Sequence, residues 1–268
     1  MDLSIEILFA FLAGLLIGSF LNVCVYRLPR DLSVVRPRSF CPGCEKTIAW
    51  YDNVPLLSYA TLGARCRHCR ARIPLRYPLV ELAIAMAFAA CVALLGWSLP
   101  ALKFSIFCAI LVTLIATDIE TQILPDEFTL GGTAVGLALA AFVPMPPGIF
   151  MLFADDFDRR WISLGEAALG AVVASGMIWL VGWIFEKVRH REGMGFGDVK
   201  MIAMMGAFLG LESVLAALII GSLLGSITGV IYSRVRKKDW RTQELPFGAF
   251  LGIAALAIAF TQIVSVPR

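Results

Sequence analysis

Long apolar blocks separated by short polar segments constrain the fold of this chain more than any other feature. Eight blocks are long enough, or nearly long enough, to cross a bilayer as helices: residues 5–26, 78–98, 100–117, 128–149, 162–188, 199–211, 213–233 and 246–264. Of the 268 residues, 59% are hydrophobic and only 16% are charged. The apolar residues also lack the period of an amphipathic helix. We therefore expect an all-α polytopic membrane protein with about eight transmembrane helices.

The first apolar block is expected to be retained as a membrane span. Asp2 and Glu6 stand near its start, and no Lys or Arg precedes it, so it lacks the basic segment that opens a signal peptide. This organisation predicts three parts: a first span over residues 1–26, a loop over residues 27–77, and a transmembrane core of about seven spans over residues 78–268.

The distribution of basic residues predicts the orientation. If the N-terminus lies outside, strict alternation of eight spans places the segments 27–77, 187–200 and 234–241 in the cytoplasm. These segments hold nineteen of the 23 Lys and Arg residues. Cytoplasmic loops of membrane proteins are enriched in Lys and Arg, so we expect both termini outside and the large loop inside.

The shortest block, residues 199–211, follows an unusual glycine-rich stretch, Gly193-Met-Gly-Phe-Gly-Asp198. Thirteen residues reach only about 20 Å as a helix, against a hydrocarbon core of about 30 Å. The block must nevertheless cross, because otherwise the basic segment 234–241 would lie outside. Burial among other helices would allow its glycine-rich end to begin below the interface. Asp198 would then lie partly inside the membrane, where an acid indicates a functional site. The alternative is that Asp198 only caps the helix.

A second carboxylate reaches the same face. The block 100–117 ends at Thr117-Asp118, so Asp118 is expected at the cytoplasmic boundary, followed by a loop without Lys or Arg. Asp126 and Glu127 in this loop also fit the acidic first turn of an ordinary helix. Asp118 precedes the loop and is not explained in that way.

Two carboxyl groups in a site of low dielectric constant cannot both ionise easily, and they tend to share a proton. Such a pair suits peptide hydrolysis: the ionised member takes a proton from water, and the protonated member hydrogen-bonds the carbonyl oxygen. The alternative use of acids within a membrane is a proton relay in a transporter. Spacing alone leaves both open.

Two CxxC motifs in the loop 27–77 predict a metal site. Cys41-Pro-Gly-Cys44 and Cys66-Arg-His-Cys69 are separated by twenty-one residues. Four thiolates in paired CxxC motifs suit tetrahedral zinc. Disulfides are the alternative, but a reducing cytoplasm disfavours them. Because four Cys ligands leave no open position for water, we expect a structural zinc that stabilises a small loop.

Motifs spread in order along nearly the whole chain resemble those of the bacterial type IV prepilin peptidases, a family of leader peptidases and N-methyltransferases. The resemblance rests on the glycine-rich stretch ending at Asp198, the segment 118–126, the paired CxxC motifs, and the segments 18–23, 26–29, 52–58, 76–81 and 246–248. One departure is that the separation of Asp118 and Asp198 is longer than usual for the family. The extra length falls in the external segment 144–161.

The resemblance implies that Asp118 and Asp198 are the catalytic pair of an aspartic endopeptidase at the cytoplasmic face of the bacterial inner membrane, with both termini periplasmic. Its substrates would be prepilins and type II secretion pseudopilins, cut after a leader that ends in Gly. The new N-terminus would then be methylated with S-adenosyl-L-methionine as the donor. Gly193, Gly195 and Gly197 would let an extended substrate strand approach Asp198.

The residues for methyl transfer are less evident, because the chain has no glycine-rich fingerprint of a soluble methyltransferase. The family places its determinants in the large loop. There, Asn53, Pro55 and Ser58 are the candidates, and roles in turns and packing are the alternative. We expect membrane lipid around the chain and no nucleic acid as a partner. The sequence makes no prediction of an oligomeric state.

Overall fold

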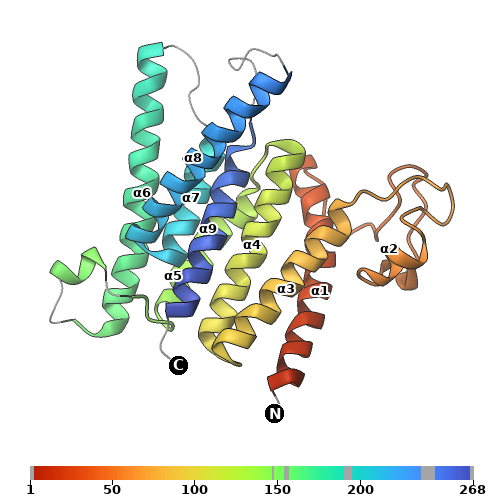
Figure 1. Cartoon of the computed structure of the whole chain (residues 1–268), viewed down its shortest axis with the longest axis horizontal. Helices are drawn as coiled ribbons and strands as arrows, with labels where there is room; N and C mark the ends of the chain where they lie inside the picture. Colours follow the sequence, from red (N-terminus) through yellow and green to blue (C-terminus); the bar gives the residue numbers. More distant parts are fainter. Residues whose placement is uncertain (1–2, 147, 154–156, 190–194, 237–244, 266–268) are drawn as a thin grey trace. The chain divides into compact units, whose positions relative to one another are not determined.

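A computed structural model describes residues 3–146, 148–153, 157–189, 195–236 and 245–265. Within these residues the regular structure is helical, apart from two isolated β-bridges in the loop after the first helix. Each of the eight apolar blocks forms a helix (Figure 1). These helices are α1 (Leu3–Arg27), α3 (Arg76–Leu95), α4 (Leu99–Thr121), α5 (Asp126–Ala140), α6 (Arg159–Arg189), α7 (Phe196–Leu209), α8 (Leu211–Arg236) and α9 (Phe247–Ser265). The all-α polytopic fold expected from the sequence is confirmed.

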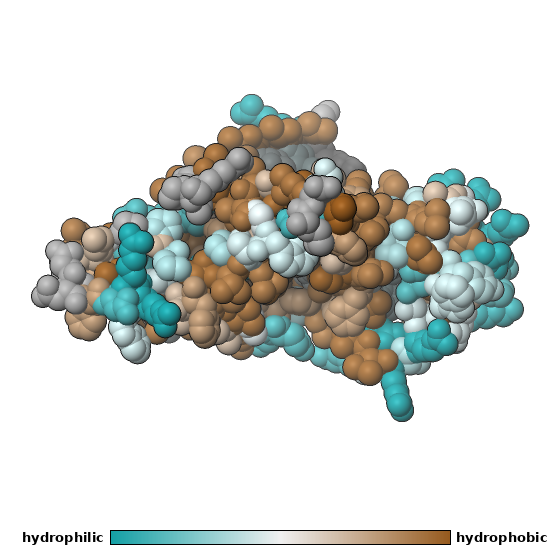
Figure 2. All heavy atoms as spheres, turned by 90° about the horizontal axis from the view of Figure 1, so that it is seen from below, coloured by the Kyte–Doolittle hydropathy of each residue, from teal (hydrophilic) through white to brown (hydrophobic). Residues whose placement is uncertain are grey.

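Six of the described helices, α1, α3, α4, α6, α8 and α9, are long and apolar enough to cross a membrane. α5 and α7 are shorter, with 15 and 14 residues. Large apolar side chains such as Leu8, Phe9 and Val172 are exposed, and Figure 2 shows hydrophobic residues over much of the surface in view. A surface of this kind suits contact with lipid.

Two helix ends differ most from the sequence-based expectation, and one of them affects the site. α4 continues to Thr121, so Asp118 lies within the helix instead of just after it. α5 ends at Ala140, nine residues before the predicted end of its block. Pro144 and Pro146 follow closely, and proline cannot continue a helix. Hydropathy alone extended this block too far, because apolar residues continue past the helix end.

The chain forms two compact units, Met1–Thr117 and Asp118–Arg268. In the first unit, α1 and α3 lie side by side (Figure 1). Gly14 and Gly18 of α1 make this possible, because a Cβ atom on either would lie 2.6 or 2.8 Å from the Cα atom of Ala85 or Glu81. Small residues four positions apart allow such close packing between membrane helices.

The loop of the first unit contains three short helices, η1 (Leu28–Arg30), η2 (Trp50–Asn53) and α2 (Leu57–Thr61). Arg27 at the end of α1 holds the start of this loop. Its buried guanidinium group donates hydrogen bonds to the carbonyl oxygens of Ser33, Pro37 and Arg38, at 2.7, 2.9 and 3.3 Å. The loop is therefore fixed to the membrane helix by its own main chain.

In the second unit, α7 is the central helix and packs against α5, α6, α8 and α9. Its residues from Met204 to Leu209 are all buried. The closest approach is at Gly206, where an added Cβ atom would lie 2.3 Å from the main-chain carbon and oxygen of Gly170 in α6. The later part of the short helix is thus buried among other helices, whereas Gly195 and Phe196 at its glycine-rich start are exposed, contrary to the expectation for that end.

The segment between α5 and α6 contains η3 (Ile149–Phe153) and is anchored on α6. Ser163 donates a hydrogen bond to the carbonyl oxygen of Ala140 at 2.7 Å and accepts one from the N–H of Met145 at 3.0 Å. Glu166 accepts a hydrogen bond from the N–H of Phe150 at 2.6 Å. The described part of this segment therefore has a defined attachment.

Candidate active site

Asp118 lies in the last turn of α4, which ends as Gln122 takes a left-handed conformation with φ of 55°. The Asp118 side chain is buried, with 5% exposed. Its Oδ2 atom accepts a hydrogen bond of 2.7 Å from the main-chain N–H of Ala249, and the N–H of Gly248 also donates to this carboxylate. Two donors at the start of α9 therefore hold an acid at the end of α4.

Asp198 lies in the first turn of α7, where the helix dipole favours an acid. The N-cap is Gly195, whose carbonyl oxygen accepts a hydrogen bond of 3.1 Å from the N–H of Asp198. The Asp198 side chain is half-buried, and its carboxyl group is close enough to that of Asp118 to interact electrostatically. The structure thus brings together the two acids that the sequence singled out.

Leu124 packs between the starts of α7 and α9. Cβ atoms added to Gly197 and Gly248 would lie 3.3 Å from Leu124 Cβ and 3.2 Å from Leu124 Cδ1. The Cβ atom on Gly248 would also lie 3.2 Å from Asp118 Oδ2. At Gly195 an added Cβ would lie 3.7 Å from Asp198 Oδ2, with no closer atom among the described residues. Gly197 and Gly248 therefore allow close packing around the acids, whereas the described residues leave space at Gly195 beside Asp198. Gly193 lies outside the described residues.

An ion pair between Lys200 and Asp126 joins α7, the helix that carries Asp198, to the start of α5. Lys200 Nζ lies 2.7 and 2.8 Å from the two carboxylate oxygens of Asp126, which begins α5. Sequence reasoning explained Asp126 only as a first-turn acid and did not identify this partner. The sequence does contain one indication of this ion pair, because a lysine stands two positions after Asp198.

The four cysteines of the paired CxxC motifs converge in the loop of the first unit. The Sγ atoms of Cys41, Cys44, Cys66 and Cys69 all lie within 4.8 Å of one another, and those of Cys41 and Cys69 are 3.7 Å apart. A tetrahedral zinc with bonds of about 2.3 Å requires sulfur–sulfur distances of about 3.8 Å. The donor set and its spacing therefore fit a zinc ion.

The two CxxC motifs are built as a structural repeat. Each first cysteine donates its N–H to a carbonyl oxygen five residues later, Cys41 to Lys46 and Cys66 to Ala71, at 3.0 and 2.9 Å. A β-bridge closes each turn, and a left-handed residue, Glu45 or Arg70, stands at the same position in both. Two equivalent turns therefore present the four sulfur atoms.

The electrostatic surroundings of the cysteines differ. The N–H groups of Cys69 and His68 lower the pKa of the Cys66 thiol to about 6. Burial instead raises the pKa of the Cys41 thiol to about 11. A buried thiolate at Cys41 therefore needs a cation beside it, and this also fits a metal ion held by the four cysteines.

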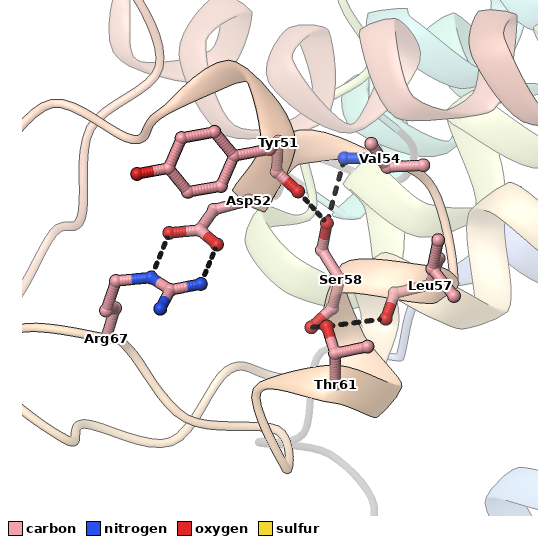
Figure 3. Close-up of polar contacts among 7 residues, drawn as sticks. All are labelled: Tyr51, Asp52, Val54, Leu57, Ser58, Thr61 and Arg67. Atoms are coloured by element: carbon pink, nitrogen blue, oxygen red, sulfur yellow. Dashed lines mark hydrogen bonds and ion pairs between the residues drawn. The ribbon is translucent and has the colours of Figure 1, made fainter.

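The segment with Asn53, Pro55 and Ser58 forms a tight turn (Figure 3). Ser58 Oγ donates a hydrogen bond to the carbonyl oxygen of Tyr51 at 3.0 Å and accepts one from the N–H of Val54 at 2.9 Å. Glu81 of α3 accepts a hydrogen bond of 2.9 Å from the N–H of Leu56. The buried Ser58 hydroxyl thus stabilises the turn.

A salt bridge connects this turn to the second CxxC motif. Arg67, which lies between Cys66 and Cys69, binds both carboxylate oxygens of Asp52 at 2.7 and 2.6 Å (Figure 3). The salt bridge lowers the pKa of Asp52. The arrangement of the cysteines is thereby coupled to the position of Asn53.

A cavity of about 390 Å³ lies between α1 and this loop. Asn53 and Pro55 line it together with Trp50, Arg38 and, from α1, Ser19 and Val23. Ligand sites for small molecules commonly have volumes of about 300–1,000 Å³. Two of the three residues considered for methyl transfer thus face a space large enough for a ligand.

Two family models and several characterised proteins match the sequence of this chain. The Bacterial Peptidase A24 N-terminal domain matches residues 12–95, and the Type IV leader peptidase family matches residues 105–230. The chain is 39% identical over 247 residues to a prepilin leader peptidase/N-methyltransferase of Myxococcus xanthus, covering 90% of this chain and 68% of that protein. Proteins of the same description are 34% identical in Burkholderia pseudomallei, covering 95% of this chain and 85% of that protein, and 35% identical in Pseudomonas aeruginosa, covering 92% and 88%. No solved structure matches the chain.

Proposed function

Because this chain belongs to the type IV leader peptidase family, we propose that it is a prepilin leader peptidase with N-methyltransferase activity and that Asp118 and Asp198 are its catalytic pair. One observation carries the assignment of the pair. The carboxyl group of Asp118, from the end of α4, lies within the range of electrostatic interaction with that of Asp198, from the start of α7. Two acids that share a proton are the functional groups of an aspartic endopeptidase.

The pair hydrolyses the peptide bond by activating water, with no covalent intermediate. One carboxylate takes a proton from the attacking water, and the protonated partner hydrogen-bonds the carbonyl oxygen of the scissile bond. The leaving amine is protonated as the carbon–nitrogen bond breaks. Burial of Asp118 supports this chemistry, because electrostatic interactions are stronger where water is excluded.

The substrates are prepilins and type II secretion pseudopilins, cut between a leader that ends in Gly and an apolar helix. Such a bond lies at the end of a membrane helix, so its hydrolysis requires acids near the membrane boundary. The space beside Asp198 at Gly195 supports the approach of an extended strand. In the same proposal, the conformational freedom of Gly193, Gly195 and Gly197 lets this strand approach Asp198.

Methylation of the new N-terminus uses S-adenosyl-L-methionine, and its site is the cavity lined by Trp50, Asn53 and Pro55. The aromatic ring of Trp50 offers a stacking surface for the adenine. Ser58 supports the site by stabilising the turn. Zinc bound by Cys41, Cys44, Cys66 and Cys69 has a structural role, because the four thiolates leave no open position for a reactant.

The protein lies in the bacterial inner membrane, surrounded by lipid. The distribution of Lys and Arg supports an orientation with both termini periplasmic and with the loop 27–77 and the two acids on the cytoplasmic side. Single cysteines introduced at Ser33 and Trp97 into a variant without reactive native cysteines test this orientation. A membrane-impermeant thiol reagent added to intact spheroplasts should label position 97 and not position 33, and the reverse labelling would overturn it.

The catalytic assignment is tested with Asp118→Asn and Asp198→Asn, each incubated in membranes with a prepilin. We expect each substitution to reduce leader removal at least about hundredfold, as for loss of an essential acid or base. Glu127→Gln in the first turn of α5 is the matched control, because it also removes a nearby carboxylate. Full leader removal by either Asp variant would refute the pair and favour the proton relay instead.

The methyl-donor site is tested with Trp50→Ala and Asn53→Ala. Both should weaken the binding of S-adenosyl-L-homocysteine, measured by calorimetry in detergent, while leader removal continues. Trp97→Ala serves as the control, because Trp97 is an exposed tryptophan of the same unit that does not line the cavity. Unchanged binding in both cavity variants would show that the donor binds elsewhere.

A further inference from the structure

The Asp118 carboxylate occupies the N-terminus of α9. Gly248 and Ala249 are the second and third residues of that helix, and both donate main-chain N–H groups to Asp118. The first N–H groups of a helix have no acceptor within the helix. Asp118 supplies that acceptor from a residue more than a hundred positions away in the sequence.

The helix that carries Asp118 does not itself favour a negative charge there. Asp118 lies in the last turn of α4, where the exposed carbonyl groups give the helix end a partial negative charge. The start of α9 has the opposite polarity, and N–H donors stabilise the charged form of a carboxylate. The charge on Asp118 therefore depends on α9.

Asp198 lies in the first turn of its own helix, α7, but no N–H group of the described residues donates to its carboxyl group. Within the described residues its carboxyl group accepts no hydrogen bond, and the charged group that interacts with it is Asp118. Lys200 lies close in sequence, but its ammonium group is paired with Asp126. In the described part of the chain, main-chain donors therefore contact the carboxyl group of Asp118 and none contacts that of Asp198.

From this asymmetry we infer that the start of α9 polarises the pair, so that Asp118 is the ionised base and Asp198 is the carboxylic acid. This inference rests on the proposed function, in which both acids act on the scissile bond. The main-chain N–H groups of Gly248 and Ala249 act through Asp118, so these two residues are positioning residues.

The assignment specifies each proton transfer. Water attacks the carbonyl carbon and gives a proton to Asp118, while Asp198 gives its proton to the carbonyl oxygen, forming a diol. The carbon–nitrogen bond then breaks as protonated Asp118 gives its proton to the leaving amine. One hydroxyl group of the diol returns a proton to Asp198, which yields the new carboxyl group. The cycle ends with Asp118 ionised and Asp198 neutral, as it began.

Ala249→Pro tests the role of α9, because proline removes one donor and is tolerated in the first turn of a helix. Without this N–H, Asp118 is harder to ionise. The acid limb of the pH profile of kcat/KM for prepilin cleavage should therefore move to higher pH, by about one unit for one hydrogen bond to a charged group. Ala249→Gly retains the N–H and should leave the acid limb in place.

Gly248→Ala provides a second variant in case the proline disturbs folding. Its Cβ atom would lie 3.2 Å from Asp118 Oδ2, so the carboxylate must shift by a few tenths of an ångström relative to its donors while both N–H groups remain. The acid limb should shift in the same direction. If both variants fold, as shown by their melting temperatures, and cleave with unshifted profiles, the role of α9 is refuted. A purely structural defect would lower cleavage at every pH without shifting the profile, and this too would count against the inference.

Infrared difference spectroscopy tests the protonation states without relying on activity. At neutral pH the carbonyl-stretch band of a protonated carboxylic acid should lose intensity in Asp198→Asn. A band of unchanged intensity in Asp198→Asn would contradict the assignment of Asp198 as the carboxylic acid. If instead Asp118→Asn or Asp198→Asn still removes leaders, the proposed function fails. Inactivity of both, with an unshifted profile in Ala249→Pro, contradicts only the polarisation by α9.

Discussion

The contact between Gly206 of α7 and Gly170 of α6 offers a direct test of how the helix that carries Asp198 is held. In Gly206→Ala the added Cβ atom would lie 2.3 Å from the main-chain carbon and oxygen of Gly170, whereas ordinary contacts begin at 3.4 Å. Both neighbouring atoms belong to the main chain, so no side chain can rotate away. One of the two helices must move by about 1 Å.

The cost of this movement can be separated from the effect of alanine on helix propensity. Overpacking typically costs about 1–3 kcal/mol, whereas alanine is favoured over glycine within a helix by about 1 kcal/mol. Gly131→Ala in α5 and Gly176→Ala in α6 are matched controls, because an added Cβ atom at either meets no atom within 4 Å. The difference between Gly206→Ala and these controls therefore measures the steric cost alone.

Thermal unfolding in detergent is the measurement. We expect Gly206→Ala to unfold at a lower temperature than either control, by about 2–4 °C for each kcal/mol in a chain of this size. Displacement of α7 also moves Asp198 relative to Asp118, and a shift of about 1 Å in reacting groups can cost about hundredfold in rate. Equal melting temperatures for Gly206→Ala and Gly131→Ala would refute the close helix contact.

Three further predictions concern the loop and the ion pair. Cys41→Ser should reduce the zinc content of the purified protein from about one equivalent per chain to below about half, measured by elemental analysis, and unchanged zinc would contradict a four-Cys site. Lys200→Met and Asp126→Asn should show a coupling energy of about 0.2–1 kcal/mol in a double-mutant cycle of unfolding, because both groups are partly exposed; strictly additive effects would mean that the pair contributes nothing. Glu81→Ala should destabilise the first unit by about 1–3 kcal/mol by leaving the N–H of Leu56 without its acceptor, and Glu81→Gln should restore much of the loss. Equal unfolding temperatures for these last two variants would show that the hydrogen bond is unimportant.

The comparison between sequence and structure is most informative at α7. The charge distribution predicts that a short block crosses the membrane. In the structure this block forms a short helix that packs against α5, α6, α8 and α9. Hydropathy did not predict the residue at which α7 begins. The helix begins at Phe196, so Asp198 lies within the first turn instead of preceding the helix.

Local patterns in the sequence were sufficient for several conclusions. Apolar blocks predicted the eight helices, because the cost of burying the main chain in lipid leaves few other structures possible. Paired CxxC motifs predicted a four-Cys site, because each motif places two thiol groups within reach of one metal ion. The acids Asp118 and Asp198 were identified from their setting at the ends of apolar blocks.

Only the tertiary structure decided how distant segments meet around those acids. The N–H groups of Ala249 and Gly248 hold Asp118, and the ion pair between Lys200 and Asp126 joins α7 to α5. No local pattern specifies either contact, because a free N–H exists at every helix start and an exposed lysine has many possible partners. Helix packing selects among them, since a close approach such as that of Gly206 to Gly170 determines which helix ends lie together. The sequence by itself thus determined the helices and the candidate groups of the site, and the packing of the helices determined the surroundings of those groups.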